Sequence, residues 1–226
     1  MAYHRGVGLT FALPKGRLLD LALPMLEAAG IALTDAVASA GRRLEVVAAD
    51  GTRVLLVKPI DVPTYVEYGV ADIGIAGRDT LEEQGRDLYE PVDLGIGACR
   101  LVVAEPVEDG GRPTRLRRTT ELRVATKYPR LARKHYLSRG IAPEIIPLLG
   151  SVELGAVTGL ADQIVDLVES GETLRQNRLT EVETIMEVTS RLVVHPASLK
   201  LRAADVSRVI EALRRVVGVS GKASVA

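Results

Sequence analysis

Two short segments of the chain carry residue types that bind anions. The first, Leu13-Pro14-Lys15-Gly16-Arg17, joins a predicted strand to a predicted helix and places two cations beside a glycine. A helix N-terminus offers unpaired backbone N–H groups and the positive end of a dipole, and glycine lets a ligand approach the backbone. The alternative is an ordinary surface turn with solvated cations, and this segment alone does not decide between them.

The second segment, Glu153–Asp162, combines two glycines, a threonine and two carboxylates ahead of a helix predicted over Ala161–Glu169. Backbone N–H groups beside glycine and the hydroxyl of Thr158 suit a phosphate monoester. Its carboxylates, together with Asp166, suit sugar hydroxyls or, with a diphosphate, a Mg²⁺ ion, which prefers oxygen ligands. The alternative is that Asp162 simply caps the predicted helix.

Other chemistries find little support in the sequence. There is no P-loop, no H-E-x-x-H, no paired C-x-x-C and no G-x-S-x-G elbow. One cysteine and three histidines cannot build a standard zinc cluster. Cys99 lies in an apolar stretch and is predicted to be a core residue. His135 shares a predicted helix with several cations, so we expect it on a solvated face.

Composition indicates a globular protein without the net positive charge that is typical of nucleic-acid-binding proteins. The 226 residues are 47% hydrophobic, and 29 Lys and Arg balance 29 Asp and Glu. The segment Glu105–Thr120 holds four arginines, and either a basic patch for phosphates or a solvated loop fits it. No apolar run suits a signal peptide or a membrane helix, so we expect a cytoplasmic protein that binds neither membrane nor nucleic acid.

Apolar runs and helical patterns alternate along the chain, which predicts an α/β fold with mostly parallel sheets. The predicted strands are Leu9–Leu13, Arg43–Ala49, Arg53–Val57, Ile73–Ala76, Arg100–Ala104, Leu122–Ala125, Glu144–Leu148 and Glu183–Val194. The predicted helices are Leu18–Ala29, Val62–Tyr68, Asp79–Gln84, Arg130–Arg139, Ala161–Glu169 and Asp205–Val217. Asp50-Gly51 predicts a hairpin between two of these strands.

A weak similarity between two segments of the sequence suggests two lobes. Phe11–Leu18 and Val124–Leu131 each run from a strand through a basic turn into a helix, and both helices end at a Gly-Ile pair. Either a duplication or the ordinary recurrence of such units in α/β proteins accounts for this.

The longest pattern in the chain resembles the signature of the ATP phosphoribosyltransferase family. It reads Glu153-x5-Gly159-x-Ala161-x2-Ile164-x-Asp166-Leu167-x2-Ser170-Gly171-x-Thr173-Leu174. The resemblance extends to Leu13-Pro14-Lys15-Gly16-Arg17-Leu18, to Asp61-Val62-Pro63-x-Tyr65-Val66, to Gly69-x-Ala71-Asp72-Ile73-Gly74-Ile75-x-Gly77-x-Asp79 and to Ala125-Thr126-Lys127-Tyr128-Pro129. It covers nearly the whole chain, from Leu9 to Val217, and resembles the short form of the family, which lacks a C-terminal regulatory domain.

The resemblance implies Mg²⁺-dependent transfer of a phosphoribosyl group from phosphoribosyl diphosphate (PRPP) to N1 of ATP, the first step of histidine biosynthesis. It implies two lobes similar to type II periplasmic binding proteins, with the active site in the cleft between them. We expect residues 1–100 plus 185–226 to form lobe one on the nucleotide side, and residues 101–184 to form the PRPP-binding lobe two.

The resemblance also assigns roles to individual positions. Lys15 and Arg17 would be catalytic and would face the diphosphate or the ATP phosphates. The 5-phosphate and ribose of PRPP would lie at Glu153, Gly155, Ala156, Val157, Thr158, Gly159, Leu160, Ala161 and Asp162. Of these, Thr158, Gly159 and Ala161 would form the phosphate cradle at a helix N-terminus. ATP would contact Lys58, Asp61, Gly77, Asp79 and Thr80. The sequence does not indicate which residues hold Mg²⁺.

For partners, the short form implies a homodimer and a hetero-oligomer with a regulatory subunit resembling histidyl-tRNA synthetase, on which histidine would bind. Two rival classes share the fold. A solute-binding protein would normally carry a signal peptide, and a transcriptional effector-binding module would need a DNA-binding domain.

Overall fold

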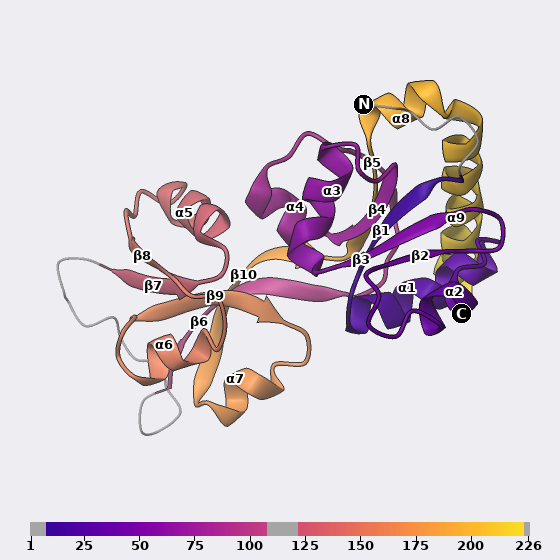
Figure 1. The fold of residues 1–226 in the computed structure, drawn as a ribbon. Helices are drawn as coiled ribbons and strands as arrows, with labels where there is room; N and C mark the ends of the chain where they lie inside the picture. Colours follow the sequence, from indigo (N-terminus) through magenta and orange to yellow (C-terminus); the bar gives the residue numbers. More distant parts are fainter. Residues whose placement is uncertain (1–7, 108–121, 224–226) are drawn as a thin grey trace. The chain divides into compact units, whose positions relative to one another are not determined.

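The computed structural model describes residues 8–107 and 122–223, which divide into two compact units (Figure 1). Unit 1 takes its described residues from 8–81, 85–97 and 189–223, and unit 2 from 82–84, 98–107 and 122–188. The chain therefore passes between units at 97–98 and at 188–189, where the sequence analysis expected 100–101 and 184–185. Most of the arginine-rich segment Glu105–Thr120 lies outside the described residues.

Unit 1 is built on a mixed sheet with the strand order β2-β3-β1-β4-β11-β5. Its strands are β1 (Thr10–Pro14), β2 (Glu45–Val47), β3 (Arg53–Val57), β4 (Ile73–Gly77), β5 (Tyr89–Asp93) and β11 (Ser190–Val194). β1 runs parallel to β3 and β4, whereas the other pairs are antiparallel. The hairpin predicted at Asp50-Gly51 is confirmed, since β2 and β3 pair antiparallel and Gly51 has a φ of 84°.

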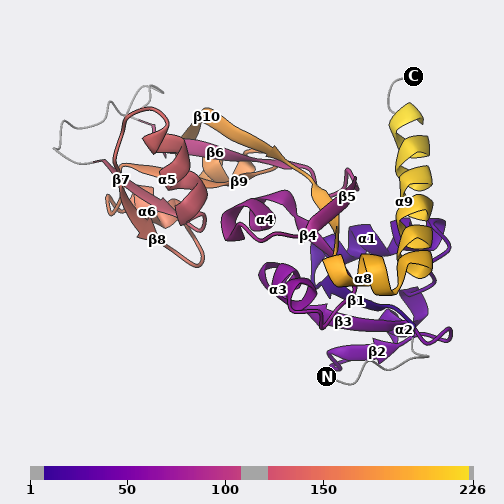
Figure 2. The ribbon, with the colours of Figure 1, turned by 90° about the horizontal axis from the view of Figure 1, so that it is seen from above.

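Helices cover both faces of this sheet (Figures 1 and 2). They are α1 (Arg17–Ala28), α2 (Thr34–Ala38), the 3₁₀ turn η1 (Pro59–Asp61), α3 (Val62–Glu67), α4 (Arg78–Gln84), α8 (Pro196–Leu201) and α9 (Ala203–Ala223). Because side chains alternate along a strand, Phe11 and Leu13 pack with α1 and α9, whereas Ala12 packs with α3 and Leu81. The apolar face predicted for the last helix is confirmed by buried Val206, Val209, Ile210 and Leu213.

Unit 2 is built on a second mixed sheet with the order β10-β6-β9-β7-β8. Its strands are β6 (Cys99–Pro106), β7 (Arg123–Thr126), β8 (Glu144–Pro147), β9 (Gln163–Val168) and β10 (Leu179–Val188). Its helices are α5 (Pro129–Leu137), α6 (Glu153–Val157) and α7 (Glu172–Gln176). Val124 and Val165 pack with α5 on one face, whereas Ala125 and Ile164 pack with α6 and Leu174 of α7 on the other.

The two units repeat one topology. In unit 1 the central strand β1 is parallel to β3 and β4, and β11 pairs antiparallel with β4. In unit 2 the central strand β7 is parallel to β8 and β9, and β6 pairs antiparallel with β9. The registers also match: Phe11 pairs with Ile73 in unit 1, and Val124 pairs with Gln163 in unit 2. The weak sequence similarity of Phe11–Leu18 to Val124–Leu131 therefore marks a repeated supersecondary structure. The sheets are parallel only at these centres, so the expectation of mostly parallel sheets was too broad.

The repeat includes a turn of the form Gly-x-Ala-Asp before β4 and before β9. Gly69 and Gly159 have φ values of 67° and 75°, a conformation that favours glycine. In unit 1 the Asp72 carboxylate accepts from the backbone N–H of Thr10 at 2.8 Å, at the start of β1. In unit 2 the Asp162 carboxylate accepts from the N–H of Arg123 at 2.9 Å, at the start of β7. Each aspartate fixes the start of the central strand of its sheet.

The predicted helix over Ala161–Glu169 is wrong, because residues Gln163–Val168 form strand β9. The run Ile-Val-Asp-Leu-Val fits both patterns, since a strand covered on both faces reads as a continuous apolar run. Asp162 is consequently a turn residue and does not cap a helix.

Two further boundaries differ from expectation. The run Glu183–Val194, predicted as one strand, divides at Thr189 into β10 and β11, which belong to different sheets. The last helix continues to Ala223 instead of ending near Val217. The short elements β5, α2, α6, α7 and α8 had no clear periodic signal in the sequence.

Candidate functional site

In unit 2, three ionisable side chains gather at the edge where the parallel strands end, which we call the carboxyl edge of the unit. Lys127 follows β7 directly, Glu153 opens α6 after the loop that leaves β8, and Asp166 lies near the end of β9. The charges of Lys127 and Glu153 both act on the Asp166 carboxylate. Ligands of open α/β sheets bind at this edge, so the cluster is a candidate for binding a sugar or a phosphate.

Asp166 is the polar member of an apolar strand face. Ile164 and Val168, two residues before and after it, belong to the buried core beneath α6. Burial raises the pKa of Asp166, whereas the hydrogen bond from the Leu167 N–H at 2.9 Å and the charge of Lys127 lower it. Perturbed carboxylates of this kind are typical of functional sites.

The same edge holds a polar turn to which the sequence analysis gave no ligand role. Ser170 and Gly171 follow β9, and Thr173 lies in the first turn of α7. Gly171 has a φ of 78°, and the Ser170 and Thr173 side chains are exposed. The signal was present in the sequence: a small polar turn after Ile164–Val168 marks a ligand-binding loop once that run is taken as a strand.

The segment expected to cradle the phosphate occupies two places. Glu153 opens α6 at the carboxyl edge, whereas Thr158–Asp162 follow α6 and precede β9 at the opposite edge. The Thr158 hydroxyl donates to the Leu154 carbonyl at 2.7 Å, and the Gly159 carbonyl accepts from the Arg123 guanidinium at 3.2 Å. Gly155 and Ala156 are buried inside α6, and Ala161 is buried beyond it, while Val157 and Leu160 are exposed.

In unit 1, the expected cations follow the parallel strands. Lys15 comes after β1 and Lys58 after β3, and the Lys15 N–H donates to the Val57 carbonyl at 2.8 Å. Arg17 opens α1 behind Gly16, whose φ is 82°. Lys15, Arg17 and Lys58 are exposed. The structure therefore brings these three residues to the carboxyl edge of unit 1, where the backbone N–H groups of α1 begin.

A second turn on this edge follows β4. Asp79 is 7% exposed, and the Thr80 hydroxyl lies 3.4 Å from its carboxylate. A Cβ atom at Gly77 would come within 2.2 Å of Asp79 Oδ1, so a larger residue at this position would require the Asp79 carboxylate to move. Asp61, at the start of α3, is exposed.

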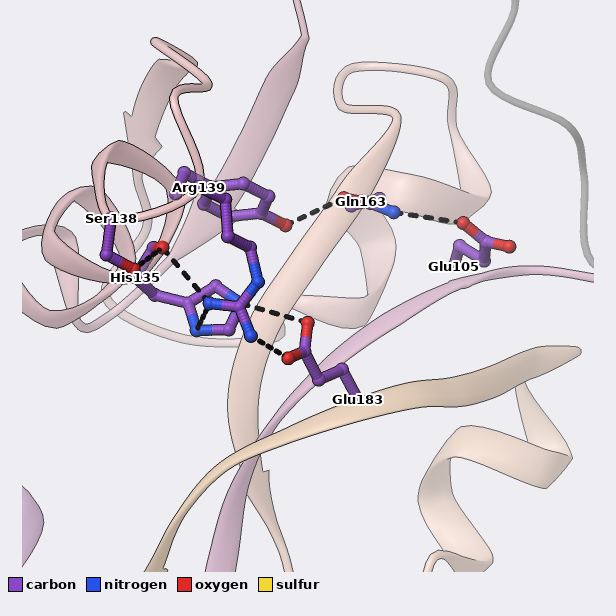
Figure 3. Close-up of polar contacts among 7 residues, drawn as sticks. Glu105, His135, Ser138, Arg139, Gln163 and Glu183 are labelled. Carbon is purple, nitrogen blue, oxygen red and sulfur yellow. Dashed lines mark hydrogen bonds and ion pairs between the residues drawn. The ribbon is translucent and has the colours of Figure 1, made fainter.

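The expectation of a solvated His135 is wrong, because this histidine is 8% exposed. Figure 3 shows the His135 ring beside Arg139 and Glu183. Its Nε2 lies 3.2 Å from Glu183 Oε2, and Arg139 ion-pairs with the same carboxylate. Burial, followed by the charge of Arg139, lowers the pKa of His135 against the opposing effect of Glu183. Arg139, one of the cations of this helix, is paired with Glu183. The cations of the helix therefore do not indicate that His135 faces solvent.

A buried polar chain lies beside this cluster. The Tyr136 hydroxyl donates to Gln163 Oε1 at 2.7 Å, and Gln163 Nε2 donates to Glu105 Oε2 at 3.0 Å. Gln163 opens β9, so the chain lies at the opposite edge of the sheet from Lys127 and Asp166. Its polar atoms are paired within the core, which indicates a structural role.

The fold and the two carboxyl edges are those of an α/β protein suited to phosphorylated ligands. Its similarity to known proteins identifies the family. Residues 58–215 match the family model "HisG: ATP phosphoribosyltransferase". A relative called ATP phosphoribosyltransferase in Sorangium cellulosum is 50% identical over 215 residues, covering 95% of this chain and 98% of the relative. Another from Syntrophotalea carbinolica is 47% identical over 209 residues, covering 92% and 95%. The chain belongs to the ATP phosphoribosyltransferase family.

Solved structures agree with this assignment. An ATP phosphoribosyl transferase (HisG:HisZ) complex from Thermotoga maritima contains a chain that is 34% identical, with a TM-score of 0.79 and coverage of 94% of this chain and 98% of that one. Two further structures share the fold alone. They are the P235GK mutant of ArgBP from T. maritima (TM-score 0.58, 14% identity, coverage 96% and 92%) and the periplasmic aliphatic sulphonate binding protein SsuA from Escherichia coli (0.58, 10%, coverage 97% and 76%). The expected likeness to periplasmic binding proteins is confirmed.

The chain is thus an enzyme that transfers a phosphoribosyl group to ATP in the first step of histidine biosynthesis. The rival interpretations, a solute-binding protein and a transcriptional effector-binding module, are set aside by the family match. Among the described residues, no helix is long and apolar enough to cross a membrane.

Proposed function

We propose that the carboxyl edge of unit 2 binds PRPP, that the carboxyl edge of unit 1 binds ATP, and that the phosphoribosyl group passes to N1 of the adenine. The observation that carries the assignment of PRPP is the cluster of Lys127, Glu153 and Asp166 beside the Ser170–Thr173 turn. A sugar phosphate needs hydroxyl acceptors and anion donors together, and this edge offers both.

The reaction makes modest chemical demands on the protein. As diphosphate leaves, the anomeric carbon becomes oxocarbenium-like, and the lone pair of neutral adenine N1 attacks it. No covalent intermediate or obligatory general base is required. Catalysis consists of holding the two substrates in line and neutralising the diphosphate. Lys15 and Arg17 are proposed for the phosphates on the ATP side, with Lys58, Asp61, Gly77, Asp79 and Thr80 around the nucleotide.

Mg²⁺ fits this proposal as a partner of the diphosphate. The described residues contain no group of three or more His, Cys, Asp or Glu side chains that could hold a metal. Mg²⁺ commonly takes only one or two carboxylates and completes its shell with phosphates and water. Glu153 and Asp166 would supply those carboxylates, and the bound ion would neutralise negative charge on the diphosphate.

Turnover tests the proposed reaction directly. The chain is mixed with ATP, PRPP and Mg²⁺, and the product is identified by mass spectrometry and its attachment point by NMR. We expect N1-phosphoribosyl-ATP and diphosphate in equal amounts, and no product when Mg²⁺ is removed with EDTA. Attachment at another nitrogen, or unchanged turnover in EDTA, would contradict the proposal.

Two substitutions separate the two candidate phosphate cradles. We expect Thr173→Val to raise the KM for PRPP about tenfold, because it removes a hydroxyl from the turn after β9. Gly159→Ala should leave this KM within about twofold and cost about 1 kcal/mol of stability, because alanine resists a positive φ. Both variants are measured for PRPP KM, ATP KM and thermal unfolding.

If Gly159→Ala raises the KM for PRPP and Thr173→Val does not, the phosphate cradle lies in the Thr158–Asp162 segment, as the sequence analysis expected. Gly69→Ala, at the matching turn of unit 1, is the control for strain without a PRPP contact. Gly69 has a φ of 67°.

We further propose that the chain forms a homodimer and joins a regulatory subunit resembling histidyl-tRNA synthetase. The solved HisG:HisZ complex of a 34% identical relative supports the hetero-oligomer. Because its substrates are ATP and PRPP, we place the enzyme in the cytoplasm.

Calorimetric titration of histidine tests the division of labour between the two subunits. We expect no binding to this chain alone and saturable binding to the complex, because the histidine site is expected on the regulatory subunit. Histidine bound there would act on this chain through different affinities for two states of the complex. Tight binding to the isolated chain, with matching inhibition, would contradict this. Light scattering on the same samples checks the homodimer and the larger assembly.

A further inference from the structure

A buried hydroxyl lies at the point where the central strand of unit 2 ends. Thr126, the last residue of β7, is 0% exposed. Its Oγ1 donates to the carbonyl of Val165 on β9 at 2.6 Å and accepts from the N–H of Tyr128 at 2.8 Å. One hydroxyl therefore bonds the neighbouring strand and the chain two residues onward.

These two bonds enclose Lys127. Thr126 is in register with Val165 in the parallel pair β7–β9, and α5 begins at Pro129. The backbone leaves the sheet between these points. The hydrogen bonds of Thr126 thus hold the residues on both sides of Lys127 and tie its turn to β9.

The strand to which the turn is tied is the strand that carries Asp166. Val165 precedes Asp166 directly, and the charge of Lys127 acts on the Asp166 carboxylate. Lys127 itself is exposed, so no burial of its side chain fixes where the ammonium group lies. The tether between the Lys127 turn and Val165 fixes the backbone from which the Lys127 side chain extends beside the strand that carries Asp166.

We propose that Thr126 is a positioning residue for phosphoribosyl transfer: its hydroxyl holds Lys127 beside Asp166 so that both meet PRPP. This inference rests on the proposed binding of PRPP at the carboxyl edge of unit 2. The competing explanation is that the hydroxyl only stabilises the unit, as buried hydrogen-bonded groups do.

The experiment compares Thr126→Val, Thr126→Ser and Lys127→Ala for kcat, for the KM of each substrate and for thermal unfolding. Valine has the shape of threonine without the hydroxyl. We expect Thr126→Val to raise the KM for PRPP about tenfold with the KM for ATP within about twofold, because Lys127 is then no longer held for its charge-assisted contact with PRPP. Serine should restore the KM for PRPP to within about threefold of the parent.

Tyr136→Phe is the control for loss of stability alone. Tyr136 is 4% exposed, belongs to the same unit and loses one buried hydrogen bond, to Gln163 at 2.7 Å, away from Lys127. We expect a lowered unfolding temperature with an unchanged KM for PRPP. If Tyr136→Phe and Thr126→Val raise this KM equally, the hydroxyl is only structural and the proposal is overturned.

The double variant Thr126→Val/Lys127→Ala shows whether the threonine acts through the lysine. We expect it to match Lys127→Ala in the KM for PRPP, because a positioning effect vanishes once the positioned group is gone. Fully additive effects would overturn the proposal. If Lys127→Ala itself leaves the KM for PRPP unchanged, the binding of PRPP at this edge fails instead.

Discussion

Replacing Asp166 with asparagine should lower kcat/KM for PRPP about 100-fold while making the fold more stable at neutral pH. The loss of activity follows from removing a charged acceptor that can bind ribose hydroxyls or Mg²⁺, since hydrogen bonds to charged groups contribute about 1.5–3 kcal/mol. The gain in stability follows from burial, which raises the pKa of this carboxyl. The asparagine Oδ1 can still accept from the Leu167 N–H, which donates at 2.9 Å.

The gain in stability depends on pH in a defined direction. Because the pKa of Asp166 is raised above its ordinary 3.8, the folded protein binds the proton more tightly than the unfolded chain. The contribution of Asp166 is therefore fully present below the ordinary pKa of 3.8 and is lost as pH rises through the raised pKa. The free energy of unfolding of Asp166→Asn should match that of the parent below the ordinary pKa of 3.8 and exceed it at pH 7.

Urea unfolding at several pH values and steady-state kinetics check both expectations. Asp162→Asn is the matched control, since it changes a partly buried aspartate of the same unit away from the carboxyl edge. We expect it to lower stability and to spare kcat/KM for PRPP. A parent-like kcat/KM in Asp166→Asn would remove Asp166 from the binding site.

Asp72→Ala should destabilise the protein strongly, by about 3 kcal/mol of unfolding free energy. The Asp72 carboxylate accepts from the Thr10 N–H at 2.8 Å, the Ser198 hydroxyl at 2.7 Å and the Arg202 guanidinium at 3.2 Å. These bonds join the start of β1 to α8 and to the residue before α9. Alanine leaves the donors without this acceptor, and the penalty for unpaired buried groups is added to the lost bonds.

Asp162→Ala, at the matching place in unit 2, should cost less, about 2 kcal/mol. Its carboxylate accepts from one residue, through the Arg123 N–H at 2.9 Å and the Arg123 guanidinium at 3.3 Å. Denaturant unfolding gives both values, and KM measurements on the folded variants should stay near those of the parent. Equal costs at the two sites, or an Asp72→Ala variant as stable as the parent, would refute this account.

The sequence by itself determined the chemistry of this protein more securely than the placement of its residues. Lys15, Arg17 and Lys58 were predicted to follow strands, and they lie at the carboxyl edge of unit 1. Turn residues and period-two alternation are local signals, so the chain shows them without its fold. The family signature named Asp166, Ser170 and Thr173, although it did not show which edge of a sheet they occupy.

Only the tertiary structure decided that the Ile164–Val168 run is a strand, because covering both of its faces erases the alternation that marks a half-exposed strand. That decision moved Thr158–Asp162 to one edge of the sheet and Ser170–Thr173 to the other. The tertiary structure also buried His135 and placed it beside Glu183 of β10, 48 positions later in the chain. Contacts between distant strands carry no local signal, so they emerge only when the sheet assembles.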